Sequence, residues 1–143
     1  MKHWEAYIKR QKPEYLCTII PPETAADIVV VIPCYNEPAL FETLHNLRIA
    51  DRPDTNVLTV IVFNSGVLAD KDVVKQNRIS YDETRLFADR YNERSFCFFP
   101  LLFENLPRKH AGVGLARKIG MDLAVEHFLC NGKSRGVIIS LDA

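Results

Sequence analysis

The sequence has few glycines, no net charge and no long apolar run, and each shortage excludes a class of protein. It holds 6 glycines in 143 residues, and neither G-x-G-x-x-G nor G-x-x-x-x-G-K-[ST] follows its first apolar run. The 18 basic and 18 acidic side chains cancel, so no overall field attracts nucleic acid or an anionic membrane. No apolar run reaches the ~18 residues of a membrane span. We therefore expect a soluble chain that binds no nucleic acid and builds any phosphate site locally.

The four cysteines are too scattered for a zinc site. No two of them lie two or three residues apart, as zinc motifs require; they are Cys17, Cys34, Cys97 and Cys130. Most stand in apolar runs, where a free cysteine behaves as a small hydrophobic residue. The first ten residues also lack the apolar core of a signal peptide. The sequence thus predicts reduced cysteines and a cytoplasmic protein.

The composition is that of one ordinary globular domain. Apolar residues make up 48% and charged residues 25%, and the length suits a single domain with a modest core. Residues 1–26 hold a short helical pattern around Trp4 and Ile8, and prolines interrupt anything longer. We expect residues 1–26 to be a lead-in segment and residues 27–143 to form the domain.

Strand-like and helix-like patterns alternate along the domain. Runs rich in β-branched or aromatic residues predict four strands, at residues 28–33, 57–63, 95–103 and 136–141. Apolar residues at helical spacing lie between them. They predict a helix capped by Asn36, one long or broken helix over residues 68–92, and a helix that starts at Gly112. This order predicts an α/β, Rossmann-like fold, with a mostly parallel sheet and helices on both faces.

Polar side chains follow the predicted strands, at the ends where such sheets bind ligands. Tyr35 could stack on a nucleobase, and Glu37 could hydrogen-bond a base or ribose. The two residues could equally form a rigid turn, with Tyr35 packed on the sheet and Glu37 near a helix N-terminus. Asn64 could meet a base edge as donor and acceptor, or serve as an ordinary turn residue.

A basic segment precedes the last predicted helix. Arg108, Lys109 and His110 lie before its start, and Arg117 lies further along it. A helix N-terminus with nearby cations suits a diphosphate, which Arg117 could bind through two parallel hydrogen bonds. The alternative is a solvated basic loop. Asp142 ends a hydrophobic strand at the ligand-binding edge, where a carboxylate has few structural reasons to occur.

Four stretches in this order resemble the family-2 glycosyltransferases, which have the GT-A fold. They are V-V-V-I-P-C-Y-N-E-P-A-L, V-I-V-F-N-S-G, K-H-A-G-V-G-L-A-R-K-I-G and G-V-I-I-S-L-D-A. The last is similar to the strand that carries the family's D-x-D metal motif. The resemblance implies metal-dependent transfer of a sugar from a nucleotide-diphosphate donor, with inversion as the family norm. The acceptor is not identified, and a glycan or a lipid-linked sugar would suit the family.

The resemblance also assigns donor-binding residues. They are Pro33, Tyr35, Glu37, Asn64, Lys109, Arg117 and Asp142. Asp142 matches the first aspartate of D-x-D, which implies contact with ribose or with an Mg²⁺ or Mn²⁺ ion that bridges the diphosphate oxygens. The sequence departs from the family at the second strand, where Phe63 and Asn64 stand in place of two aspartates. A UDP-sugar is the favoured donor, although this departure leaves the base open.

The sequence ends inside this motif, because the second aspartate would be residue 144. We expect a GT-A domain that is incomplete at its C-terminus, with the catalytic base downstream and no catalytic residue in these 143 residues. Such a fragment would bind donor weakly and transfer nothing. Its last strand would leave a bare sheet edge, which predicts a homo-oligomer. The complete enzyme is expected in the cytoplasm, where it could associate with the inner face of a membrane.

Two alternatives stay open. A non-catalytic nucleotide-binding or interaction module could keep the fold without transferring sugar, and absence of the base from the full gene would favour it. A sugar-nucleotide pyrophosphorylase shares the general architecture. Those enzymes usually place a glycine-rich, basic loop after the first strand, which P-C-Y-N-E does not resemble.

Overall fold

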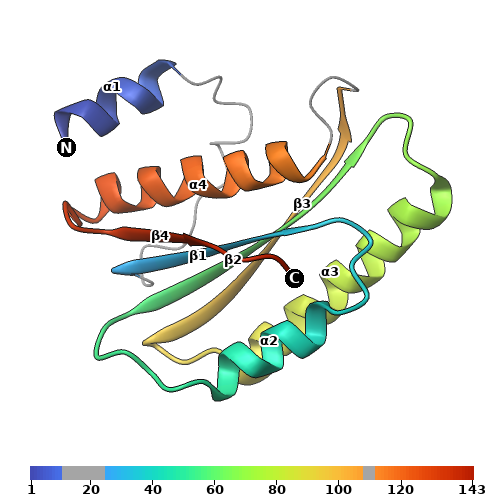
Figure 1. Cartoon of the computed structure of the whole chain (residues 1–143), viewed down its shortest axis with the longest axis horizontal. Helices are drawn as coiled ribbons and strands as arrows, with labels where there is room; N and C mark the ends of the chain where they lie inside the picture. Colours follow the sequence, from blue (N-terminus) through green and yellow to red (C-terminus); the bar gives the residue numbers. More distant parts are fainter. Residues whose placement is uncertain (11–24, 108–111) are drawn as a thin grey trace.

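A parallel sheet of four strands forms the centre of the molecule (Figure 1). The computed structural model describes residues 1–10, 25–107 and 112–143. The elements in chain order are α1 (Lys2–Arg10), β1 (Ile28–Cys34), α2 (Leu40–Ile49), β2 (Val57–Gly66), α3 (Lys71–Tyr91), β3 (Phe96–Leu106), α4 (Val113–Cys130) and β4 (Val137–Ser140). The strand order is β3-β2-β1-β4, and every neighbouring pair is parallel. The predicted α/β fold is confirmed.

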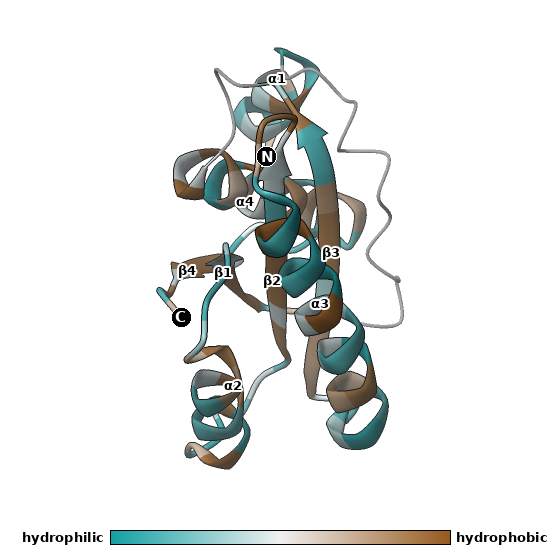
Figure 2. Ribbon diagram, turned by 90° about the vertical axis from the view of Figure 1, so that its right-hand side faces the viewer, coloured by the Kyte–Doolittle hydropathy of each residue, from teal (hydrophilic) through white to brown (hydrophobic). Residues whose placement is uncertain are grey.

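Helices cover both faces of the sheet. Helix α4 lies on one face with α1 outside it, and α2 and α3 lie on the other face (Figure 1). Strands β1 and β2 are buried almost throughout, as continuous β-branched runs between two helical layers should be. Figure 2 shows β3 hydrophobic along most of its length and hydrophilic at its arrowhead. Because the four strands are parallel, their carboxyl ends lie at one end of the sheet.

The path of the chain reverses across the sheet after β3. It runs from β1 through β2 to β3, and then returns past β1 to β4. The first two crossover helices therefore lie on one face and α4 on the other. Helix α2, which follows β1, and helix α4, which precedes β4, therefore lie on opposite faces of the sheet. Open α/β sheets bind ligands beside such a point, beyond the carboxyl ends of the strands.

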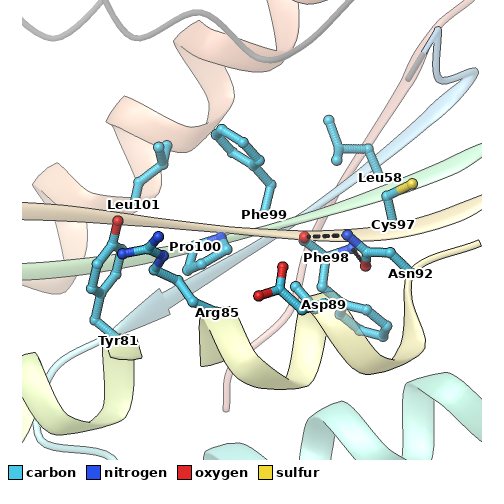
Figure 3. A pocket seen from close by; sticks show the side chains of 11 residues that line it. Leu58, Tyr81, Arg85, Asp89, Asn92, Cys97, Phe98, Phe99, Pro100 and Leu101 are labelled. Atoms are coloured by element: carbon cyan, nitrogen blue, oxygen red, sulfur yellow. Dashed lines mark hydrogen bonds between the residues drawn. The ribbon is translucent and has the colours of Figure 1, made fainter. Parts of the chain in front are cut away.

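The two edge strands differ in how their outer sides are covered. Beside β3, the Asn92 side chain accepts the Phe98 N–H at 2.7 Å and donates to the Phe98 carbonyl at 3.2 Å, and Pro100 has no N–H to offer (Figure 3). No strand of the described ranges pairs with the outer side of β4. Val137 and Ile139, which share one face of β4, are 50% and 44% exposed. A bare apolar edge invites pairing with another chain. Self-association stays a prediction, which light scattering of concentrated protein tests.

Several element boundaries differ from those predicted. Strand β2 continues through Asn64 to Gly66, and β3 continues to Leu106, where polar residues had suggested a turn and a loop. The strands stay paired through a register shift between Asn64 and Gly66, because backbone hydrogen bonds tolerate polar side chains. The predicted cap at Asn36 is wrong: α2 begins at Leu40, and Asn36 has a left-handed φ of 46°. Helix α3 is one unbroken helix.

Helix α1 lies where the lead-in pattern predicted a short helix, and it packs on α4. Trp4 and Ile8 contact the core beneath α4. The Tyr7 hydroxyl donates a hydrogen bond to the buried Asp122 carboxylate at 2.6 Å. This bond raises the pKa of Tyr7 above its usual range. Among the described residues, no helix has both the length and the apolar character needed to cross a bilayer.

Candidate functional site

The carboxyl ends of β2, β1 and β4 bring predicted site residues together at one end of the sheet, which is called an edge below. Strands β1 and β2 pair as far as Cys34 and Phe63, so Tyr35 and Asn64 follow side by side in the register. Asp142 lies two residues beyond β4, on the other side of β1. Helix α4 also starts at this edge, which lies on the right in Figure 1. One edge therefore gathers residues that are far apart in the sequence.

Arg117 and Asp142 form an ion pair at this edge. Nη2 of Arg117 donates to Oδ1 of Asp142 at 2.7 Å, although the residues are 25 positions apart. Their side chains are 37% and 82% exposed, so solvent limits the pair to about 0–1 kcal/mol. The pair can open at little cost when a ligand offers a phosphate to the arginine or a cation to the carboxylate.

Three buried polar atoms near this edge have no hydrogen-bond partner among the described residues. They are Asn64 Oδ1, Ser65 Oγ and Arg117 Nε. Asn64 is 0% exposed and Ser65 is 1% exposed. Leaving a buried polar atom unbonded costs about 1–3 kcal/mol, and native proteins leave few such atoms. A free acceptor, a hydroxyl and a cationic N–H together suit a polar, anionic ligand.

The turn after β1 exposes one aromatic ring. Tyr35 is 42% exposed, so its ring is open to solvent instead of packed into the core. Glu37 is partly buried. Pro33 is buried in β1 beside Val62, where it can shape the turn but offers no polar group. Burial raises the pKa of the Cys34 thiol to about 12, so the thiol stays protonated at neutral pH.

The start of α4 adds a second feature that favours anions. Gly112 precedes the helix with φ 137° and ψ 178°, a conformation that essentially only glycine adopts. A helix N-terminus carries partial positive charge and N–H groups without intrahelical partners. Lys109 falls outside the described residues, so its contact with a diphosphate stays a prediction.

Asn77 is a residue of this region that the sequence analysis missed. It is 1% exposed, and its side chain bonds to both the Asn36 N–H and the Asn64 carbonyl, at 3.0 Å each. Helix α3 has the sequence of a charged surface helix. Its spacing does not distinguish a buried asparagine from an exposed one. The burial of Asn77, Ser80 and Thr84 on one helix face is evident only from the structure, so the sequence offered no signal for Asn77.

Asp142 is the residue predicted to ligate a metal ion. Within the described parts of the chain, no three His, Cys, Asp or Glu side chains gather in a way that could hold one. Oδ1 of Asp142 is engaged by Arg117, which leaves Oδ2 for a cation. Mg²⁺ takes about six oxygen ligands, most of which must then come from water and diphosphate. The residues fit a metal shared with a ligand and do not form a metal centre of their own.

A groove of about 610 Å³ lies elsewhere, along α3 and β3 (Figure 3). Tyr81, Arg85 and Asp89 line it from α3. None of its lining residues belongs to the buried polar groups that lack partners, and Asn92 within it is bonded to the backbone of β3. The groove thus lacks the unmet hydrogen-bonding groups of the carboxyl-end site, and we do not assign the function to it.

Comparison with known proteins does not assign the chain to a family. No protein-family model, curated protein or solved structure matches it. The resemblance described for the sequence stays an expectation. Function must therefore be argued from the geometry of the carboxyl-end site.

Proposed function

We propose that the chain binds the nucleotide-diphosphate sugar of a metal-assisted transfer reaction, in the manner of the family-2 glycosyltransferases. One observation carries the proposal. Arg117 and Asp142 meet at 2.7 Å beyond the carboxyl ends of the strands, next to the point where the crossovers reverse. Open α/β sheets bind ligands there. A cation and a carboxylate held side by side suit a diphosphate together with its metal ion.

Each part of the donor has a candidate partner. The Tyr35 ring can stack on the base. Asn64 Oδ1 is buried, so it can accept an N–H from a base edge such as that of uracil only when the residues that cover it move aside. Arg117 can turn from Asp142 to the diphosphate, with Nε as a further donor. Asp142 then contacts ribose or an Mg²⁺ or Mn²⁺ ion. The remaining proposed donor contacts are Pro33, Glu37 and Lys109.

The spacing of the strands supports a single ligand. Asn64 lies on β2 and Asp142 lies beyond β4, with β1 between them. Two strand spacings amount to roughly 10 Å, which one nucleoside diphosphate can span. The base would lie over the turn between β1 and α2, and the diphosphate would lie near the start of α4.

Calorimetric titration with UDP and a panel of UDP-sugars tests the proposal. We expect binding in the presence of Mn²⁺ that weakens after treatment with EDTA. Arg117→Ala should weaken binding about tenfold, since it removes a charged hydrogen-bonding partner of the diphosphate. The matched control is Lys133→Ala, which breaks an ion pair with Asp27 at the opposite ends of the strands. This control should bind within about twofold of wild type.

Two results would contradict the proposal. One is the absence of binding by any nucleotide diphosphate at millimolar concentration, and the other is an equal loss in the two variants. Preference for a purine nucleotide would keep the diphosphate site and replace the uridine assignment. Hydrolysis of UDP-sugars by the full-length protein with Mn²⁺, followed by chromatography, separates a transferase from a non-catalytic binding module.

A further inference from the structure

Three asparagines connect the segments that surround the carboxyl-end site. Asn77 from α3 accepts the Asn36 N–H at Oδ1 and donates from Nδ2 to the Asn64 carbonyl, both at 3.0 Å. Asn64 donates from its own Nδ2 to the Gly112 carbonyl at 2.9 Å. We call Asn36, Asn77 and Asn64 the asparagine bridge. It ties the turn after β1, the end of β2 and the start of α4 to one another.

Asn77 differs from the other buried polar residues of α3. Ser80 and Thr84 share its helix face, but their hydrogen bonds stay within the helix. Gln76 donates to Ser80 Oγ at 3.3 Å, and the Thr84 hydroxyl donates to the Ser80 carbonyl at 2.6 Å. The side-chain oxygen and nitrogen of Asn77 both form hydrogen bonds with other segments. The hydrogen bonds of the Asn77 side chain therefore do not stabilise α3 itself. They hold the neighbouring turns in place.

The turn that Asn77 holds has a backbone conformation that few residues adopt. Asn36 has a φ of 46°, and the left-handed region costs most residues roughly 1–2 kcal/mol. Asn36 directly follows Tyr35, so its conformation helps to set the position of the Tyr35 ring. The hydrogen bond from the Asn36 N–H to Asn77 stabilises this conformation. Without that bond the turn has other conformations available.

We infer that Asn77 is a positioning residue of the proposed donor site. It fixes the Tyr35 turn relative to Asn64, so that the ring and the amide act on one nucleobase. The inference rests on the proposed function. Asn77 is buried and touches no ligand, so its effect on binding passes through Asn36 and Asn64. A ligand that binds without the bridge must order the turn itself, which lowers its affinity.

A double-mutant cycle tests this role. The affinity for UDP with Mn²⁺ is measured by calorimetry for wild type, Asn77→Leu, Tyr35→Ala and the double variant. Asn77→Leu should weaken binding about tenfold. The matched control is Thr84→Val on the same face of α3, which should bind within about twofold of wild type. In the Tyr35→Ala background the effect of Asn77→Leu should shrink to about twofold, because the ring that Asn77 positions is absent.

Amide hydrogen exchange gives a second readout that does not depend on UDP. The Asn36 amide should exchange faster in Asn77→Leu than in Thr84→Val. If Asn77→Leu does not fold, the smaller Asn77→Ala replaces it, because it removes both hydrogen bonds without adding bulk. In that variant too the Asn36 amide should exchange faster than in Thr84→Val, while UDP binding weakens severalfold.

Each outcome can be told apart. The positioning role is overturned if folded Asn77→Leu binds UDP as wild type does. It is also overturned if the effect of Asn77→Leu is the same with and without the Tyr35 ring. If wild-type protein binds no nucleotide diphosphate, the proposed function itself is wrong, and the inference is lost with it.

Discussion

The amino ends and the carboxyl ends of the strands carry opposite kinds of polar group. At the amino ends, the Asp27 carboxylate accepts hydrogen bonds from Lys133 Nζ at 2.8 Å, the Thr55 hydroxyl at 2.6 Å and the Asn56 N–H at 3.3 Å. Near the carboxyl ends, three buried polar atoms lack partners within the described ranges. Two further buried polar atoms without partners in those ranges, Arg48 Nε in α2 and Thr59 Oγ1 early in β2, lie away from the carboxyl ends. The carboxyl ends therefore hold most, but not all, of these unmet groups.

Polar groups at the two ends of the sheet should affect different properties of the protein. The hydrogen bond from Lys133, and then that from Thr55, lower the pKa of Asp27 to about 2, so the folded protein favours its charged form. Buried groups without partners have the opposite effect, because they lower the stability of the protein until a ligand satisfies them. We therefore expect changes at the amino ends to alter stability, and changes at the carboxyl ends to alter binding.

A change in the middle of α4 should affect both properties and have the largest effect on stability. Helix α4 lies so close to β1 that a methyl group at Gly120 would be 2.3 Å from Val31 Cγ1. Gly120→Ala must push the helix away from the strand, at a cost of about 1–3 kcal/mol. It should also weaken UDP binding, because Arg117 moves with the helix.

Chemical denaturation measures this loss of stability. Gly114→Ala is the control on the same helix, because a methyl group there would have no neighbour within 4 Å. Alanine favours a helix over glycine, so this control should be neutral or stabilising. Equal stability of the two variants would contradict the close approach of α4 and β1.

Asp27→Asn should lower stability and leave binding intact. The Asp27 side chain is 39% exposed, so solvent screens its ion pair and we expect a loss of about 1 kcal/mol. Asp142→Asn should show the reverse, with stability within about 0.5 kcal/mol of wild type and weaker nucleotide binding. Urea denaturation and calorimetry on both variants make the comparison. A loss of binding in Asp27→Asn at unchanged stability would contradict the division of roles between the two ends of the sheet.

The contribution of Asp27 should disappear in acid. Its pKa is about 2 in the folded protein, below its ordinary value of 3.8. A lowered pKa means stability that is present above about pH 4 and lost as the pH falls toward 2. The stability difference between wild type and Asp27→Asn, measured by urea denaturation at a series of pH values, should shrink across this window. A difference that stays constant from pH 5 to pH 2 would rule out the assigned cause.

The smallest expected effects come from removing a buried hydroxyl at each end of β2. Ser65 Oγ and Thr59 Oγ1 are both buried without partners among the described residues. Ser65→Ala and Thr59→Val should each stabilise the protein by up to about 1 kcal/mol. Only Ser65→Ala, near the carboxyl ends, should weaken UDP binding. Thermal melting and calorimetry test this, and equal UDP affinity in the two variants would remove Ser65 from the site.

The order of the elements could be predicted from the sequence, whereas several boundaries could not. Strands β1 and β2 are continuous β-branched runs, and this pattern indicates a strand buried on both faces wherever it lies in the sheet. Asn64 and Asn105 are typical turn residues, yet both belong to strands. Asn105 keeps a left-handed φ of 57° beside the register shift, so the strand accommodates its local preference. Pairing between β2 and β3 continues past both residues, and a pattern read along one strand does not include that pairing.

The sequence placed candidate residues at the carboxyl ends of the strands, and their roles in donor binding stay predictions. The contacts among these residues could not be predicted. Arg117 and Asp142 were expected to bind the donor, yet their ion pair depends on how α4 crosses back to β4. The role of Asn77 depends on three segments meeting, and no spacing within α3 indicates it. The unmet acceptor of Asn64 likewise follows from burial, which its position after an apolar run did not reveal.

The central claim is that the carboxyl ends of β2, β1 and β4 form one site for a nucleotide diphosphate. An amide NMR titration with UDP and Mg²⁺ locates the bound ligand most directly. We expect the largest shifts at Tyr35, Ser65 and Gly112, with unchanged signals at Asn56 and Gly132 near the amino ends. Shifts confined to the amino ends, or to the groove along α3 and β3, would contradict the claim.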